Sequence, residues 1–362
     1  MLDMSPVNMA LVLVVLNKNR PRTELALMLS RMYRVEALID FDDAWFAMDR
    51  EIPAIVLTDL ETADVHGANH IAHKHKHEKL CDVPFVIMGN EPADNCAAHF
   101  EANGDFYLQR PVSSGNLLNC LNANMNRAIE KRWESLPPLQ STALRETVQQ
   151  FQAISRAIET GKPLDMAENR KSCESLLETV TSKQYRSILD NIQGHHNYTY
   201  VHSVRVATFL SVFGDAIGMK GDDLMTLTTG GLLHDVGKMA TPPDILNKNG
   251  KLNEQEWGVM VNHVTHSKTV LERTPEITRG ITIIAQQHHE KLDGSGYPLG
   301  LKGAQLNDLA RMSTIVDIFG ALTDERSYKP AMEPERAFEI LEEMGAKLDQ
   351  PLVRVFRDVL SS

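Results

Sequence analysis

Cysteine is scarce in this chain, and the few cysteines present form no pattern. The 362 residues include four, Cys81, Cys96, Cys120 and Cys173, and no two of them are spaced as CxxC. This scatter argues against a zinc ribbon and against a disulfide framework. The composition suits a reducing compartment, and we therefore expect a cytoplasmic protein.

Long apolar runs and an excess of positive charge are also missing. The run from Met9 to Leu16 is too short to span a bilayer, and neither a basic region nor a cleavage site flanks it. The formal net charge is -11, whereas nonspecific nucleic-acid binding requires a positive field. We expect no membrane segment and no large nucleic-acid partner, and an anionic ligand would need a local basic pocket.

The chain is long enough, at 362 residues with 43% apolar side chains, for two or three domains. Residues 8–125 alternate helical stretches with β-branched runs at 10–16, 54–58 and 84–88, which predicts a doubly wound α/β domain. From 164 to 362 the pattern is helical almost throughout. The sequence thus predicts a multidomain protein, α/β first and all-α second.

A polar stretch at 126–163, interrupted by Pro137-Pro138, separates these regions and predicts a linker helix. One face of this helix carries an apolar stripe, made of Leu144, Val148, Phe151, Ile154 and Ile158. Such a stripe can pack on its own domain or pair with a second chain to form a homodimer. The sequence leaves both arrangements open.

Buried charge is the strongest chemical signal in the helical region. His234-Asp235 lies in the apolar segment 231–237, and Asp317 interrupts another apolar run at 313–319. An ionised carboxylate in such surroundings is costly unless a cation or donor compensates it. The same region is rich in histidine, so Asp235 and Asp317 are candidates to hold cations together with His234 and other imidazoles.

These residues, followed by the loop Asp293-Gly294-Ser295-Gly296-Tyr297-Pro298, resemble the HD-GYP family of cyclic-di-GMP phosphodiesterases over about 186–348. The resemblance implies that His202, His234 and Asp317 hold one metal, that His263, His288 and His289 hold the other, and that Asp235 bridges both. Imidazole and carboxylate ligands suit iron or manganese, with zinc or nickel also possible. Asp235 and the two metals would form the catalytic centre of a phosphohydrolase.

The same resemblance implies roles for residues around the metals. Lys238 would stabilise charge on the phosphate or protonate the leaving oxygen. Tyr297 offers a flat face on which a guanine can stack. Gly294 and Gly296 would let the loop adopt positive φ and approach the ligand closely. Arg326 and Lys329 match positions that neutralise the phosphates. The implied reaction converts cyclic-di-GMP to pGpG, and the sequence leaves open whether the product stops there or continues to GMP. Two alternatives are a cyclic-di-GMP sensor that acts through signalling partners and a hydrolase of another nucleotide.

The chain departs from the family at Tyr198, where some members carry a glutamate for a third metal. We therefore expect two metals, with His195 or His196 as a less favoured source of a substitute ligand. His266, three residues after His263, is expected at the surface.

The first region resembles a response-regulator receiver domain, with Asp59 at a strand end, Gly67 eight residues later and Leu108-Gln109-Arg110-Pro111 at the last strand. The acidic residues that would hold Mg²⁺ are replaced by Asn17-Lys18-Asn19, and Gly89 and Arg110 replace a hydroxyl residue and a lysine. We expect a regulatory domain for docking or dimerisation in which Asp59 is not efficiently phosphorylated. The histidines at 70, 73, 75 and 77, interleaved with lysines, are expected at the surface.

Overall fold

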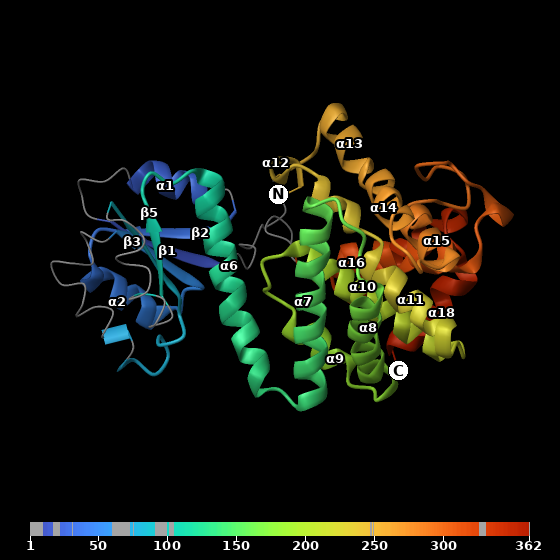
Figure 1. The fold of residues 1–362 in the computed structure, drawn as a ribbon, viewed down its shortest axis with the longest axis horizontal. Coiled ribbons are helices and arrows are strands. Elements are labelled where there is room, and N and C mark those ends of the chain that lie inside the picture. Colours follow the sequence, from blue (N-terminus) through green and yellow to red (C-terminus); the bar gives the residue numbers. More distant parts are fainter. Residues whose placement is uncertain are drawn as a thin grey trace. The chain divides into compact units, whose positions relative to one another are not determined.

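The computed structural model describes residues 10–16, 22–30, 32–59, 73–74, 76–90, 100, 105–246, 248, 250–325 and 331–361. They form two compact units (Figure 1). Unit 1 contains the described residues up to Arg132 together with Gly194–Asn197, and unit 2 contains Trp133–Gln193 and the described residues from Tyr198 onward. No helix within these ranges is both long enough and apolar enough to cross a bilayer.

Unit 1 is built on a five-stranded parallel sheet with the strand order β2-β1-β3-β4-β5. Its elements, in chain order, are β1 (Leu11–Val15), α1 (Arg22–Leu29), β2 (Arg34–Leu38), α2 (Phe41–Arg50), β3 (Ile55–Asp59), β4 (Phe85–Gly89), β5 (Phe106–Gln109) and α6 (Ser114–Arg132). The three apolar runs predicted as strands are β1, β3 and β4. A parallel α/β domain is therefore present, as predicted.

Successive side chains of each strand point to opposite faces of this sheet, and both faces are covered. On one face Leu13 and Val15 join a buried cluster with Phe41 of α2. On the other face Val14 joins a cluster with Leu117 of α6. Burial on both sides explains why the strands read as continuous apolar runs instead of alternating ones.

The positions that decide receiver chemistry are described only in part. Asp59 ends β3 and is 2% exposed, whereas residues 17–19 and Gly67 lie outside the described residues. Of the histidines expected at the surface, 70 and 75 also lie outside them. His73 is exposed beside Trp45, and His77 is half-buried with Nε2 3.6 Å from Asp49 Oδ1.

Unit 2 is helical. Its α-helices are α7 (Pro138–Glu159), α8 (Met166–Thr181), α9 (Tyr185–Asn191), α10 (Tyr198–Ala216), α11 (Gly221–Leu233), α12 (Pro243–Leu246), α13 (Glu254–Val261), α14 (His263–Glu272), α15 (Arg279–Gln287), α16 (Asp308–Thr323), α17 (Pro334–Glu343) and α18 (Gln350–Ser361). Short 3-10 helices lie at η1 (Trp133–Ser135), η2 (Val236–Ala240), η3 (Gly303–Gln305) and η4 (Gly345–Lys347). The all-α prediction for this region is confirmed.

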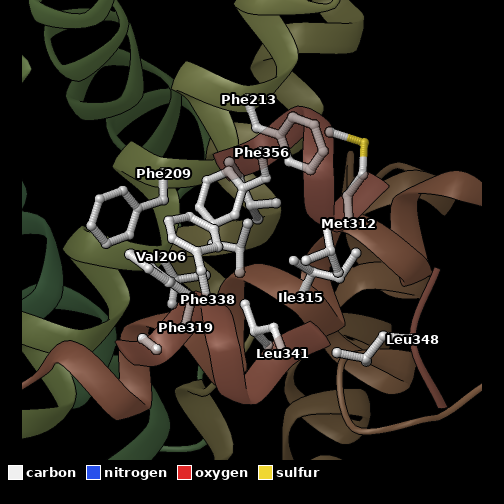
Figure 2. Packing of buried hydrophobic residues seen from close by; sticks show 14 of the residues in the cluster. Val206, Phe209, Phe213, Met312, Ile315, Phe319, Phe338, Leu341, Leu348 and Phe356 are labelled. Carbon is white, nitrogen blue, oxygen red and sulfur yellow. The ribbon is translucent and has the colours of Figure 1, made fainter. Parts of the chain in front are cut away.

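An aromatic cluster joins α10, α16, α17 and α18 into the main core of unit 2 (Figure 2). Phe356 of α18 lies at its centre, with ring centroids 5.1 Å from Phe213, 5.2 Å from Phe319 and 5.6 Å from Phe338. This packing holds α10 against α16, and these two helices carry His202 and Asp317.

The stretch predicted as one linker helix is divided in the structure. Residues up to Arg132 complete α6 in unit 1, and α7 begins at Pro138 in unit 2. The stripe on α7 packs within its own unit, because Leu144, Val148, Phe151 and Ile154 are all buried there. This arrangement leaves those four side chains unavailable for pairing with a second chain.

Candidate metal centre

Seven candidate ligands from five segments converge in unit 2, on helices that lie together in Figure 1. They form two groups, Asp235 with His263, His288 and His289, and His202 with His234 and Asp317. Within each group, one ligand atom per residue lies within 4.8 Å of the others. All of them are buried except His289, whose side chain is 20% exposed.

Helix ends and a short 3-10 turn deliver most of these side chains. His234 follows the last residue of α11, and Asp235 precedes η2, so the backbone turns between them. His263 is the first residue of α14, and His288 follows the end of α15. His202 and Asp317 instead project from within α10 and α16.

The two oxygens of Asp235 are divided between the two groups. Oδ2 lies 3.2 Å from Nε2 of His234 and 3.7 Å from Nε2 of His202. Oδ1 lies 3.2 Å from Nε2 of His263 and 3.7 Å from Nε2 of His288. One carboxylate can therefore contribute an oxygen to each of two adjacent cations.

Asp317 also reaches both groups. Its Oδ1 lies 2.9 Å from Nε2 of His202 and 3.7 Å from Nε2 of His234, and its Oδ2 lies 3.4 Å from Nδ1 of His289. The two carboxylates thus bring both sets of imidazoles into one continuous cluster.

Hydrogen bonds at the far side of the rings set the tautomers of three histidines. Nδ1 of His234 donates to the carbonyl of Gly231 at 2.7 Å, and Nδ1 of His263 donates to that of Met260 at 2.7 Å. Nδ1 of His288 donates to the carbonyl of Ala285 at 3.1 Å. A neutral imidazole that carries its proton on Nδ1 presents a lone pair at Nε2, which is the form that binds metals.

The atoms that point into the cluster fit a divalent cation. Among the described residues, Nε2 of His234, His263 and His288 and Oδ1 of Asp235 are buried without a hydrogen-bond partner. A buried polar atom without a partner costs free energy, and cations held by the two groups would satisfy these four atoms. Nitrogen and carboxylate donors without thiolate suit first-row divalent metals.

Electrostatics favour a cation at the same place. Burial would raise the pKa of Asp235, but Lys238 and His234 outweigh it and hold that pKa well below its usual range. Burial would also raise the pKa of Asp317, but His202 and His234 keep it well below its usual range. Burial opposes protonation of His234, yet the carboxylates of Asp235 and Asp317 raise its pKa to about 10. Two ionised carboxylates in a buried centre attract a proton there and would attract a divalent ion more strongly.

Asp324 belongs to this centre although the sequence did not single it out. Its Oδ2 accepts from Nδ1 of His202 at 2.8 Å, and its Oδ1 forms an ion pair with Arg205. Arg205 also donates to Oγ1 of Thr323 at 2.9 Å. Asp324 is 2% exposed and directly follows α16, so only the packing of α16 on α10 reveals its role.

Tyr198 lies beside the candidate centre, whereas His195 and His196, the possible substitute ligands, are part of unit 1. Tyr198 stacks on the ring of His202, with its hydroxyl 3.4 Å from Oδ2 of Asp324. His195 and His196 belong to unit 1, where Nε2 of His195 is 3.1 Å from Glu130 Oε1 and the backbone N–H of His196 donates to Asn126 at 2.6 Å. His266 is half-buried, and its Nε2 accepts from Asn262 at 3.0 Å.

Lys238 lies beside the shared carboxylate of Asp235. Its Nζ is 2.5 Å from Oδ2 of Asp235, and its side chain is 16% exposed. This ammonium group therefore points at the carboxylate that is shared by both groups.

The loop after His289 is fixed by hydrogen bonds to a buried carboxylate of the same unit. Glu290 is 1% exposed, and its carboxylate accepts from the N–H groups of Leu299 at 2.7 Å and Leu301 at 3.0 Å. Gly294 has φ of 81°, as expected, but Gly296 has no positive φ. A Cβ on Gly296 would lie 2.4 Å from Cα of Glu290 and 2.5 Å from the carbonyl oxygen of His289, so this glycine permits close approach to the chain's own backbone.

Tyr297 connects the metal cluster to the exterior. Its ring stacks on His289, with centroids 4.5 Å apart and planes inclined by 29°. Burial raises the pKa of its phenol, and the charges of Asp317 and Asp235 add to the effect. One face of Tyr297 is therefore already covered by His289.

Arg326 and Lys329, which the resemblance implied as partners of the phosphates, lie outside the described residues.

Comparison with protein families agrees with this centre. Residues 186–352 match the model of the HD domain, and this range contains all seven candidate ligands. A structure described as an HDG"Y"P protein from Bdellovibrio bacteriovorus is similar in fold, with a TM-score of 0.51 and 17% identity over 68% of this chain and 80% of that one. At that identity the likeness concerns the fold alone.

The curated relatives are phosphodiesterases of cyclic dinucleotides. The chain is 34% identical over 159 residues to a cyclic di-GMP phosphodiesterase from Pseudomonas aeruginosa, covering 44% of this chain and 38% of that protein. It is 38% identical over 146 residues to a 3'3'-cGAMP-specific phosphodiesterase from Vibrio cholerae, covering 40% of this chain and 32% of that protein. A probable cyclic di-GMP phosphodiesterase of Vibrio cholerae aligns over 91% of this chain and 73% of its own length at 29% identity. The chain thus spans about a third of the length of the first two relatives.

Proposed function

We propose that this chain is a two-metal phosphodiesterase that hydrolyses cyclic-di-GMP to pGpG and on to GMP. The observation that carries the proposal is the division of the Asp235 carboxylate, with one oxygen 3.2 Å from His234 and the other 3.2 Å from His263. Such sharing suits a pair of adjacent cations. The HD match and the names of the relatives support the reaction class.

The proposed ligands are His202, His234 and Asp317 for one ion, His263, His288 and His289 for the other, and Asp235 for both. Two divalent ions there, iron or manganese by preference, would activate a water and neutralise charge on the phosphodiester. Lys238, poised on Asp235, would stabilise charge on the phosphate or protonate the leaving oxygen. Tyr297 would border the base, and Arg326 and Lys329 would neutralise the phosphates.

The direct test is turnover of cyclic-di-GMP by the purified chain loaded with Mn²⁺ or Fe²⁺, followed by chromatography of the products. We expect pGpG to appear first and GMP afterwards. Asp235→Asn and His234→Ala should abolish both products, because each variant disrupts the shared centre. An inactive wild-type chain that still binds the dinucleotide would favour the sensor alternative.

A second candidate substrate follows from the relatives. One of them is named as specific for 3'3'-cGAMP and is 38% identical over the aligned part, so substrate choice within cyclic dinucleotides stays open. Rates measured on both dinucleotides with one preparation decide between them. A preference for a mononucleotide would contradict both.

For unit 1 we propose a receiver-like regulatory role without efficient phosphorylation of Asp59. The parallel sheet with the order β2-β1-β3-β4-β5 and the place of Asp59 at the end of β3 support it. Incubation with a small phosphodonor and Mg²⁺ tests this role, and stable labelling of Asp59 would overturn the second half of it.

A further inference from the structure

An exposed indole stands beside the candidate metal centre without belonging to it. Trp257 is 51% exposed, and its ring centroid lies 6.1 Å from that of Tyr297, with the planes inclined by 78°. Tyr297 in turn stacks on His289. A path of aromatic rings therefore leads from the imidazoles of the centre to an indole at the surface.

The helix that carries Trp257 does not fill a core. None of the side chains of α13 is buried, and α13 leads directly into α14, which begins at His263 (Figure 1). Its start is fixed by a capping box between Asn253 and Glu256, and Nζ of Lys248 binds the Glu256 carboxylate at 2.5 Å. The helix is thus tied at its first turn and presents its largest apolar side chain to solvent.

We propose that Trp257 is a stacking platform for a purine base of the dinucleotide whose phosphodiester lies at the metal centre. This inference rests on the proposed function and extends it. Because one face of Tyr297 is taken by His289, the tyrosine alone offers limited stacking area, and the indole next to it supplies a second aromatic surface. Every base can stack on an aromatic side chain, and a purine gains more from it than a pyrimidine because its two fused rings cover more of the indole.

The test compares two substrates that share a backbone and differ in their bases, cyclic-di-GMP and 3'3'-cyclic di-UMP. Trp257→Ala should raise KM for cyclic-di-GMP by about ten-fold with kcat nearly unchanged, in line with the contribution of one stacked base. The ratio of kcat/KM for the purine over the pyrimidine substrate should fall. Trp257→Phe, which keeps an aromatic ring, should lie between the wild type and the alanine variant.

Ile217→Ala serves as the control, because Ile217 is also an exposed apolar residue of unit 2, at 44% exposure. It should leave both substrates unaffected. An equal loss on both substrates in Trp257→Ala would assign the residue a merely structural role, and no change on either would also overturn the proposal.

A binding measurement separates this proposal from the proposed activity. Trp257 is one of three tryptophans, and stacking of guanosine monophosphate on it should quench fluorescence in the wild type and not in Trp257→Phe. If the wild type does not hydrolyse cyclic-di-GMP, the proposed phosphodiesterase activity is wrong, but fluorescence quenching still tests whether a base stacks on Trp257. Unaltered quenching in Trp257→Phe would overturn the platform whatever the activity.

Discussion

Nδ1 of His202 lies 2.8 Å from Oδ2 of Asp324, a carboxylate that is itself paired with Arg205. With Nδ1–H donated to Asp324, Nε2 of His202 faces Oδ1 of Asp317 at 2.9 Å. A carboxylate in this position fixes the tautomer and orientation of a metal-binding imidazole and raises its basicity.

The Asp324–His202 pair predicts a loss of metal affinity when the carboxylate is removed. Asp324→Ala should weaken metal binding by about 10–100-fold, the usual cost of losing such a partner. Titration with a metal in competition with a chelator measures this directly, without relying on activity. Affinity equal to the wild type would show that Asp324 only neutralises Arg205.

A second variant separates orientation of the ring from folding. Gly320 lies one helical turn before Asp324, and a Cβ there would be 3.7 Å from Nδ1 of His202. Gly320→Asp in the Asp324→Ala background should place a carboxylate on the same nitrogen and recover part of the affinity. Failure of this rescue in a folded protein would contradict the orienting role.

Lys238 provides a test of chemistry as distinct from metal binding. Lys238→Met keeps the length of the side chain but removes the ammonium group that lies 2.5 Å from Asp235. We expect kcat to fall by about 100-fold, within the range for a lost general acid or charge-stabilising donor, while both metals are retained. Loss of metal in parallel with activity would assign Lys238 a structural role instead.

Asp235 and Asp317 could be found from the sequence because charge inside apolar runs is visible without a structure, whereas the full set of seven candidate ligands came from the family resemblance. Asp324 could not be found in this way, since its importance depends on which turn of α16 faces His202. Trp257 was missed for a similar reason, because contact with Tyr297 arises only when α13 approaches the loop after His289.

For the fold, too, the sequence predicted the elements with a clear apolar pattern but not which surfaces pack together. The apolar runs that became β1, β3 and β4 had an unambiguous pattern, whereas the stripe on α7 could not specify its partner. For Gly296, the sequence suggested positive φ and approach to a ligand, but the residue instead makes room for the backbone at His289 and Glu290. A glycine in a sequence signals a missing side chain without saying what fills the space.

Acid should destabilise the protein partly through His196. Burial lowers the pKa of this imidazole from 6.5 to about 4, and the neighbouring His195 adds to the effect. Between these values the unfolded chain binds a proton that the folded chain does not, so stability falls as the pH drops from about 6.5 towards 4. Because His196 is half-buried, we expect the effect to be about 1–2 kcal/mol.

His196→Gln should flatten the dependence of unfolding free energy on pH over this window, as measured by denaturant titrations at pH 7 and pH 4.5. His73→Gln is the matched control, since it removes an exposed histidine of the same unit. Identical slopes for wild type and His196→Gln would contradict the prediction.

The aromatic core of unit 2 predicts a large loss of stability at Phe356, which is 0% exposed and packs against four other phenylalanine rings (Figure 2). Phe356→Ala should cost about 3–5 kcal/mol in unfolding free energy. Val355→Ala, the adjacent residue of α18 at 38% exposure, should cost far less. Similar costs for the two variants in urea denaturation would contradict this packing.

Metal content of the chain, purified without oxygen and measured together with protein concentration, tests the central claim most directly. The shared position of Asp235 predicts two divalent ions per chain in the wild type and fewer than one in Asp235→Ala, because each group loses an oxygen ligand. A wild-type chain that binds no more than one ion after loading, or an Asp235→Ala variant that keeps both, would contradict the account.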